Sequence, residues 1–170
     1  CGRDPEPLMQ GGTGSLSIQQ DMPDFLPDRG EAGTVNVPGI CGLAAGMTHI
    51  RHVGLKAIAA REEREAMRAA QGLAGLGLRV FTGPHQAGVL SFLPPDGDCE
   101  TAAERFAARG VALRAGVHCA PTAHESAGTL ETGTVRASFG PDASPEQTRG
   151  FLQTAAALWG GKTGQKVARM

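Results

Sequence analysis

The segment 114–124, R-A-G-V-H-C-A-P-T-A-H, constrains the fold most, because a strand-like run leads into it and bending residues interrupt it. The run covers residues 111–115 and is apolar except for its single arginine. Gly116 and Pro121 favour a bend on either side of Cys119. Rigid elements often position reactive groups on such loops. The pattern therefore predicts a thiol presented on a turn at the end of a strand.

The periodicity of the apolar residues predicts how the rest of the chain is arranged around this turn. It indicates helices and strands in this order: a helix from residue 37, a helix over 55–73, strands over 78–82 and 87–92, a helix over 100–108, strands over 111–115 and 134–139, and a helix from residue 145. This order is typical of a two-layer α+β domain, in which helices pack on a small sheet.

Local signals sharpen the prediction for three of the helices. Asn36 is placed to cap the first helix, with Pro38 in its first turn, and S-P-E-Q at 144–147 is a capping box. The charged run 61–65, together with Arg68, is predicted to be the solvent-exposed face of its helix. Three glycines share one side of the first helix and predict close packing there: Gly39, Gly42 and Gly46.

Size and charge exclude several classes of function. The 170 residues suffice for one ordinary core. Charged residues make up 19% of the chain and the net charge is −1, so no long-range field favours nucleic acid or a membrane surface. No apolar run approaches the roughly 18 residues that span a bilayer. We therefore expect a soluble domain with a small-molecule ligand. Its start, at Cys1 without any periodicity, indicates a cut through a longer protein.

The cysteines lie far apart and form no C-x-x-C pair: Cys1, Cys41, Cys99 and Cys119. This spacing favours reduced thiols and a cytoplasmic location over a disulfide framework. Two possible cations beside Cys119, Arg114 and His118, favour a thiolate nucleophile, although spacing alone equally allows a structural cysteine. A zinc site with His118, Cys119 and His124 lacks a fourth ligand, because the remaining cysteines show no fitting spacing, so we expect no metal. A thiol hydrolase with His124 as base lacks a third orienting group.

Arg136 is a second functional candidate, because it interrupts the apolar strand T-V-R-A-S-F. An unpaired guanidinium is costly to bury, so a partner is expected. A substrate carboxylate suits its planar geometry. A salt bridge to one of the chain's own acids is the alternative.

Two glycine-rich segments invite comparison with phosphate-binding loops. Q-G-G-T-G-S at 10–15 can cradle a phosphate with its N–H groups and the hydroxyl of Thr13 or Ser15, or it is a flexible linker. The tail G-G-K-T-G-Q-K lacks the nucleotide-binding pattern, because Ala156 stands where the first glycine belongs. It also ends a helix instead of joining a strand to one, so we interpret it as a frayed terminus.

Together, these motifs resemble pyridoxal-phosphate cysteine desulfurases of the class V aminotransferase family. R-A-G-V-H-C-A-P, T-V-R-A-S-F-G and the Ser-Pro-Glu helix start are similar to the C-terminal part of these enzymes. Upstream, G-G-T-G-S, R-G-E-A-G-T-V-N and P-G-I-C-G-L-A-A-G-M follow the family's order of motifs. The resemblance extends from Pro7 to about Trp159. The family pattern differs at Gly30, where it has an aromatic or apolar residue, and at Val35, where it has proline.

The resemblance implies a fold-type I enzyme of which this chain contains the small C-terminal α+β domain. Residues 1–36 would be an interface and cofactor-phosphate segment left from the large domain, 37–160 the small domain and 161–170 a tail. Cys119 would take the sulfur of L-cysteine as a persulfide while alanine leaves. The family also implies a homodimer, pyridoxal 5'-phosphate and a sulfur-acceptor protein, in a pathway such as iron–sulfur cluster assembly.

The resemblance assigns binding roles to further residues. Arg136 would hold the substrate carboxylate, and Arg114 would shape the cysteine loop or assist. Thr34 would reach the cofactor phosphate across the dimer interface, with Gly12 and Thr13 near the same interface.

The lysine that anchors the cofactor belongs upstream of the glycine-rich segment in this family. The chain has only Lys56, Lys162 and Lys166, on a predicted surface helix and in the tail. We therefore expect the chain alone to be inactive, and to expose the apolar face that a large domain covers. Two alternatives stay open: a sister enzyme such as a selenocysteine lyase, epimerase or aminotransferase-like enzyme, and a non-catalytic module that accepts sulfur or dimerises.

Overall fold

The computed structural model describes residues 6–16 and 18–160. The chain divides into two compact units, Cys1–His52 and Val53–Met170. This division differs from the boundary expected after residue 36, because nearly all of the helix that begins at residue 37 groups with the first unit. The expected tail, residues 161–170, lies outside the described residues.

The first unit contains a short 3-10 helix, η1 (Asp28–Gly30), and a longer helix, α1 (Val37–Val53). The predicted cap is confirmed, since Asn36 Oδ1 accepts a 3.0 Å hydrogen bond from the Gly39 N–H. α1 buries none of its residues, so the close packing predicted at its glycines is not seen in the described part of the chain. It has large apolar side chains that are 45–64% exposed: Val37, Ile40, Leu43, Met47 and Ile50.

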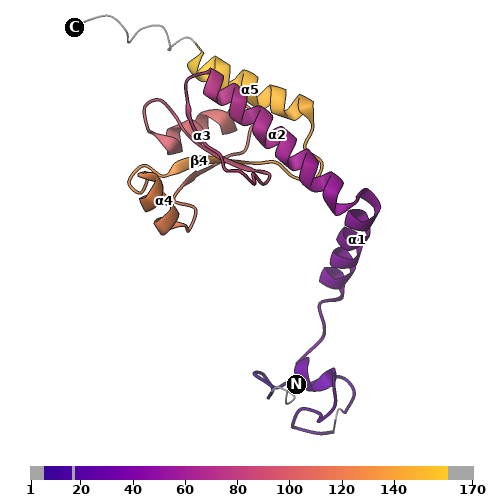
Figure 1. Ribbon diagram of the computed structural model, residues 1–170. Coiled ribbons are helices and arrows are strands. Elements are labelled where there is room, and N and C mark those ends of the chain that lie inside the picture. The colour runs from indigo at the N-terminus through magenta and orange to yellow at the C-terminus, as the bar shows by residue number, and fades with distance from the viewer. Residues whose placement is uncertain (1–5, 17, 161–170) are drawn as a thin grey trace, which may run out of the picture. The chain divides into compact units, whose positions relative to one another are not determined.

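The second unit is a two-layer α+β fold, as the sequence predicts. Its strands form one antiparallel sheet in the order β1-β2-β4-β3, and α2, α3 and α5 lie on one side of it (Figure 1). The elements are α2 (Leu55–Gly75), β1 (Arg79–Phe81), β2 (Val89–Leu93), α3 (Cys99–Ala107), β3 (Arg114–Gly116), α4 (Pro121–Ala127), β4 (Thr134–Ser138) and α5 (Pro145–Trp159). No helix within the described ranges is long and apolar enough to cross a membrane.

Local sequence signals predict most of these boundaries, with two exceptions. The capping box is confirmed, since Ser144 Oγ accepts from the Gln147 N–H and Gln147 Oε1 accepts from the Ser144 N–H. The third predicted strand is wrong over 111–113, because β3 begins only at residue 114. Pro121 bends the chain as predicted, but it also opens the unexpected helix α4, where its missing N–H has no helical partner to lose.

The side chains of the sheet alternate between its two faces. The apolar face packs against the helices and carries four buried residues: Leu90, Phe92, Val135 and Ala137. Ser91 of β2 and Arg136 of β4 are register partners between these positions, so their side chains share the opposite face. The three helices therefore leave this second face without the cover that they give to the first.

Four aromatic rings from three elements meet in the core. The ring centroid of Phe92 on β2 lies 6.4 Å from that of Phe106 on α3. It lies 6.2 Å and 6.3 Å from those of Phe151 and Trp159 on α5. Such pairs contribute about 0.5–1.5 kcal/mol each beyond the buried area. The cluster therefore stabilises the packing of α3 and α5 on the sheet.

Part of the charged run on α2 is buried, which corrects the prediction of a fully exposed face. The Glu65 side chain is 3% exposed, and its Oε2 accepts a 2.6 Å hydrogen bond from Thr148 Oγ1 on α5. Arg68 Nη1 lies 3.7 Å from the same carboxylate oxygen. The charged residues around Glu65 in the sequence predict that its side chain is exposed to solvent. In the structure this side chain is buried because α5 packs on α2.

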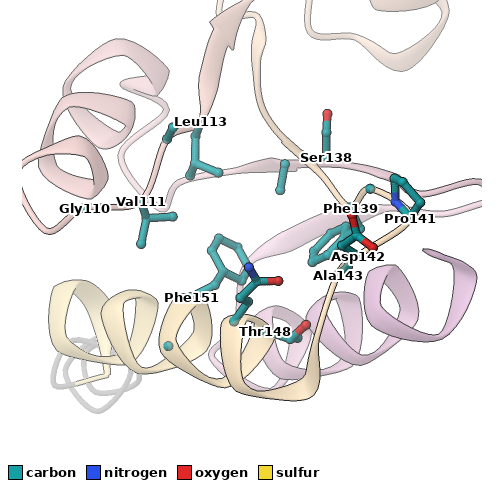
Figure 2. Close-up of a pocket in the computed structure, with 15 residues that line it drawn as sticks. Gly110, Val111, Leu113, Ser138, Phe139, Pro141, Asp142, Ala143, Thr148 and Phe151 are labelled. Carbon is teal, nitrogen blue, oxygen red and sulfur yellow. The ribbon is translucent and has the colours of Figure 1, made fainter. Parts of the chain in front are cut away.

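A cavity of about 540 Å³ opens between α5 and the segments beside β3 and β4. Figure 2 shows Phe151 and Thr148 of α5 facing it, together with Val111 and Leu113 from the segment before β3. Its other walls come from residues 137–143. None of the predicted site residues lines this cavity, so the candidate chemistry lies elsewhere on the unit.

Candidate active site

Cys119 lies exposed on a turn between β3 and α4, as the sequence predicts. His118 and Cys119 have φ angles of 55° and 58°, in the left-handed region that side-chain-bearing residues rarely adopt. Gly116 just before them has a φ of 109°, which is readily accessible to glycine. The Ala120 N–H donates a 3.0 Å hydrogen bond to the Val117 carbonyl and closes the turn. The thiol thus stands on a backbone that needs support from its surroundings.

The ring of His118 is partly buried and lies against β4, with Nε2 3.1 Å from the Thr134 carbonyl oxygen. A carbonyl only accepts, so Nε2 carries the donated hydrogen. Burial lowers the pKa of this ring; the charges of Arg136, His124 and Arg114 lower it further, against the backbone hydrogen bond, which raises it. The ring is therefore neutral at pH 7, which corrects its interpretation as a cation beside the thiol. Its buried Nδ1 has no hydrogen-bond partner among the described residues.

His124 on α4 lies next to His118, with the two ring centroids 5.8 Å apart. It is 7% exposed, and its Nδ1 lies 2.8 Å from Thr129 Oγ1. Thr129 is 1% exposed, and its N–H also donates a 2.8 Å hydrogen bond to the His124 carbonyl. The sequence pattern does not single out Thr129, although the threonine directly follows a glycine that ends a helix. These hydrogen bonds hold the buried His124 ring in a fixed position next to His118.

Arg114 and Arg136 are direct partners across β3 and β4, so both side chains lie on the sheet face opposite the core. Arg136 is partly buried, and its Nε has no hydrogen-bond partner in the part of the chain that the structure describes. Neither arginine forms an ion pair with a described acid, so the alternative of an internal salt bridge is not found there. The face offers unused guanidinium donors, which suit a carboxylate.

The residues with predicted phosphate roles lie in the first unit. The Gly33 N–H donates a 2.9 Å hydrogen bond to the Gly12 carbonyl, so the glycine-rich segment lies beside the one that carries Thr34. The hydroxyl oxygens of Thr13 and Ser15 are 2.8 Å apart. Gly12 and Thr34 are both exposed, and no atom lies within 4 Å of the place of a Cβ on Gly12. Hydroxyl and amide donors on such an open surface fit a phosphate group.

The predicted residues thus form two groups, one in each compact unit. Arg114, Cys119 and Arg136 lie in the second unit, and the phosphate candidates lie in the first. Lys56 is exposed on α2 in the second unit. The other lysines, at 162 and 166, lie outside the described residues.

The remaining described cysteines differ from Cys119 in their surroundings. Cys41 is exposed on α1 of the first unit. Cys99 is buried at the start of α3, and burial raises the pKa of its thiol, with the charges of Asp98 and Asp96 adding to the effect. Across the described residues, no group of three His, Cys, Asp or Glu is placed to hold a metal ion. Cys119 is the exposed thiol of the second unit.

Comparisons with known proteins agree with one another. A family model for class V aminotransferases matches residues 3–151. The cysteine desulfurase of Synechococcus elongatus is 36% identical over 137 residues, which are 78% of this chain and 22% of the relative. The probable cysteine desulfurase of Pyrococcus abyssi is 35% identical over 130 residues, which are 74% of this chain and 32% of the relative.

Among solved structures, the apo cysteine desulfurase of Thermococcus onnurineus matches with a TM-score of 0.76 and 32% identity. The match covers 92% of this chain and 40% of that chain. The chain therefore spans less than half the length of each of these relatives.

Proposed function

This chain belongs to the class V aminotransferase family, and on that premise we propose that it forms the sulfur-accepting part of a pyridoxal-phosphate-dependent cysteine desulfurase. One observation supports the proposal most. Cys119 is exposed on a left-handed turn, beside a sheet face where Arg136 has unused donors and no acidic partner among the described residues. The proposed reaction converts L-cysteine to alanine and leaves the sulfur on the protein.

Cys119 is the proposed sulfur acceptor. Its thiolate forms a bond to the sulfur of the substrate while the bond between that sulfur and the β-carbon breaks. The carbon keeps the electron pair and takes up a proton, which balances the proton lost from the Cys119 thiol. Alanine leaves and Cys119 remains as a persulfide. Pyridoxal phosphate, when bound, supplies the electron sink for this bond cleavage.

Arg136 is the proposed site for the substrate carboxylate. A guanidinium binds a carboxylate through parallel N–H···O bonds, and the partly buried position of Arg136 strengthens such bonds. Arg114, directly opposite on β3, adds a second positive charge and lies three residues before the turn. Both residues therefore orient the substrate relative to Cys119.

Thr34, Gly12 and Thr13 are the proposed contacts of the cofactor phosphate, made across the interface of a homodimer. Exposed Gly12 and Thr34 and partly buried Thr13, on two adjacent segments, support this assignment. Lys56, exposed on a helix downstream of the glycine-rich segment, does not match the position of the cofactor lysine, so we assign that lysine to a part of the enzyme outside this chain. An acceptor protein takes the sulfur from exposed Cys119, for a use such as iron–sulfur cluster assembly.

The test joins this chain to the cofactor-holding part of a relative. A chimera in which it replaces the matching part of the Thermococcus onnurineus enzyme should form alanine from L-cysteine. Cys119→Ala should reduce alanine formation to the level without enzyme. Arg136→Gln should lower kcat/KM about ten- to hundredfold, mainly through KM, because charge-assisted hydrogen bonds to the carboxylate are lost. Lys56→Gln is the control and should leave the rate unchanged.

The same assay separates the alternatives. Activity that survives Cys119→Ala would favour a sister enzyme that needs no persulfide, such as a selenocysteine lyase. A folded, cofactor-loaded chimera without activity would favour a non-catalytic module. The chain by itself, supplied with pyridoxal phosphate and cysteine, should release no sulfide, and brisk turnover would refute the assignment of the lysine to another part.

A further inference from the structure

We propose that His118 is a positioning residue for Cys119, because its ring, tied to β4, holds the left-handed turn that presents the thiol. The inference rests on the proposed sulfur-accepting role of Cys119. It goes further by naming the contact that sets the geometry of this thiol, so that the turn is ready before substrate arrives.

The backbone of the turn does not favour this geometry by itself. His118 and Cys119 are the two non-glycine residues with positive φ in the part of the chain that the structure describes. Residues in such regions persist only where the surrounding structure over-determines them. Histidine, like asparagine and aspartate, is enriched in this region but cysteine is not, so the support for Cys119 must come from outside that residue.

The ring of His118 supplies that support by reaching the neighbouring strand. Its Nε2 donates to the Thr134 carbonyl over 3.1 Å, at the first residue of β4. Thr134 pairs with Gly116 of β3, two residues before His118. Gly133 has a φ of 64°, and a Cβ there would lie 2.6 Å from the Gly116 carbonyl carbon. Glycine thus allows the two backbones to approach closely enough for the ring to bridge them.

A second set of contacts supports the ring from the other side. The centroid of the His124 ring lies 5.8 Å from that of His118, and His124 Nδ1 lies 2.8 Å from Thr129 Oγ1. The Gly133 N–H donates a 2.8 Å hydrogen bond to the Thr129 carbonyl. Together these contacts form a closed ring, which runs from His118 through Thr134, Gly133, Thr129 and His124 back to His118. A displaced ring would therefore disturb several contacts together.

The charge state of the ring fits a positioning role. Burial lowers the pKa of His118, and the charges of Arg136, His124 and Arg114 lower it further. A neutral ring donates from Nε2 to Thr134 but provides no positive charge for the thiolate. Its effect on Cys119 is therefore geometric.

The first experiment uses the unmodified chain. Nuclear magnetic resonance of the isotope-labelled protein at neutral pH should show a neutral His118 ring with its hydrogen on Nε2. A ring with its hydrogen on Nδ1 alone could not donate to Thr134, and this result would overturn the proposal.

The second experiment compares two substitutions that differ in reach. His118→Gln places an amide N–H near the position of Nε2, whereas His118→Asn tolerates the left-handed backbone but is too short to reach Thr134. Two rates should change about three- to tenfold in His118→Asn. One is the alkylation rate of Cys119 relative to exposed Cys41, and the other is the hydrogen-exchange rate of the Ala120 amide. His118→Gln should stay close to the parent chain on both measures.

The outcomes separate the possibilities. No change in His118→Asn, or equal changes in both variants, would overturn the proposal, because the bond to Thr134 would not be what holds the turn. Buried Cys99 reports unfolding by becoming reactive. If His118→Asn unfolds, the proposal is tested by the tautomer of the His118 ring in the unmodified chain.

An activity measurement distinguishes positioning from stability. In the chimera, His118→Asn should lower kcat for alanine formation and leave the KM for cysteine unchanged, with rescue by His118→Gln. Arg136→Gln should instead raise the KM for cysteine and leave kcat largely unchanged. If Cys119→Ala keeps full activity, the proposed function fails, while the alkylation and exchange results still decide whether His118 positions the thiol.

Discussion

The two faces of the sheet use the same strands for different purposes. On the covered face, Leu90 and Phe92 are fully buried under the helices. On the opposite face, Ser91 lies beside Arg136, and Arg136 lies beside Arg114. Because side chains alternate along a strand, a shift of one residue separates positions that stabilise the fold from positions proposed to bind substrate. Substitutions at adjacent residues should therefore have unrelated effects.

The largest expected difference between the faces lies at two neighbouring residues of β2. Phe92→Ala should lower the free energy of unfolding by about 3–5 kcal/mol, because it leaves a cavity beside the three remaining aromatic rings of the cluster. Ser91→Ala, one residue away on the other face, should change it by less than about 0.5 kcal/mol. Urea unfolding followed by Trp159 fluorescence measures both. Equal losses would show that the second face also contributes to the core.

A smaller effect is expected from the polar pair on the covered side. Thr148→Val should cost about 1–3 kcal/mol, because the buried Glu65 carboxylate loses the hydroxyl that donates to it. The double variant Glu65→Leu with Thr148→Val should be more stable than the sum of the two single changes predicts. Chemical denaturation of all four proteins completes the cycle. Additive losses would show that the two side chains do not depend on each other.

The smallest expected effect, and the one of opposite sign, belongs to the open face. Arg114→Gln should raise the free energy of unfolding by about 0.2–1 kcal/mol at low salt, because it removes a like charge directly opposite Arg136. The gain should shrink at about 1 M salt, where the screening length is about 3 Å. Lys56→Gln on α2 is the control and should show no such gain. A loss of stability in Arg114→Gln would contradict the division between the faces.

Much of the fold is predictable from local patterns. Apolar periodicity predicts α2, α3, α5, β1, β2 and β4, and Asn36 and Ser144 are confirmed as caps. The sequence does not predict the helix α4, because its seven residues are too few for an amphipathic repeat to stand out. It does not predict the burial of Glu65, because the partner of Glu65 lies 83 residues away. Signals that act within one turn are readable, and those that need a distant element are not.

The features of the candidate site also divide into those that the sequence predicts and those that only the structure shows. The sequence by itself determined which residues are proposed to carry the chemistry, since the order of its motifs indicated Cys119 and Arg136 within a known family. Only the tertiary structure decided that Arg114 stands opposite Arg136 and that the His118 ring reaches Thr134. It also decided that α2, α3 and α5 pack on the other face of the sheet and not on the one that carries the arginines. The reason is physical: strand register and helix packing bring together groups that are distant in the chain, and no local propensity encodes either of them.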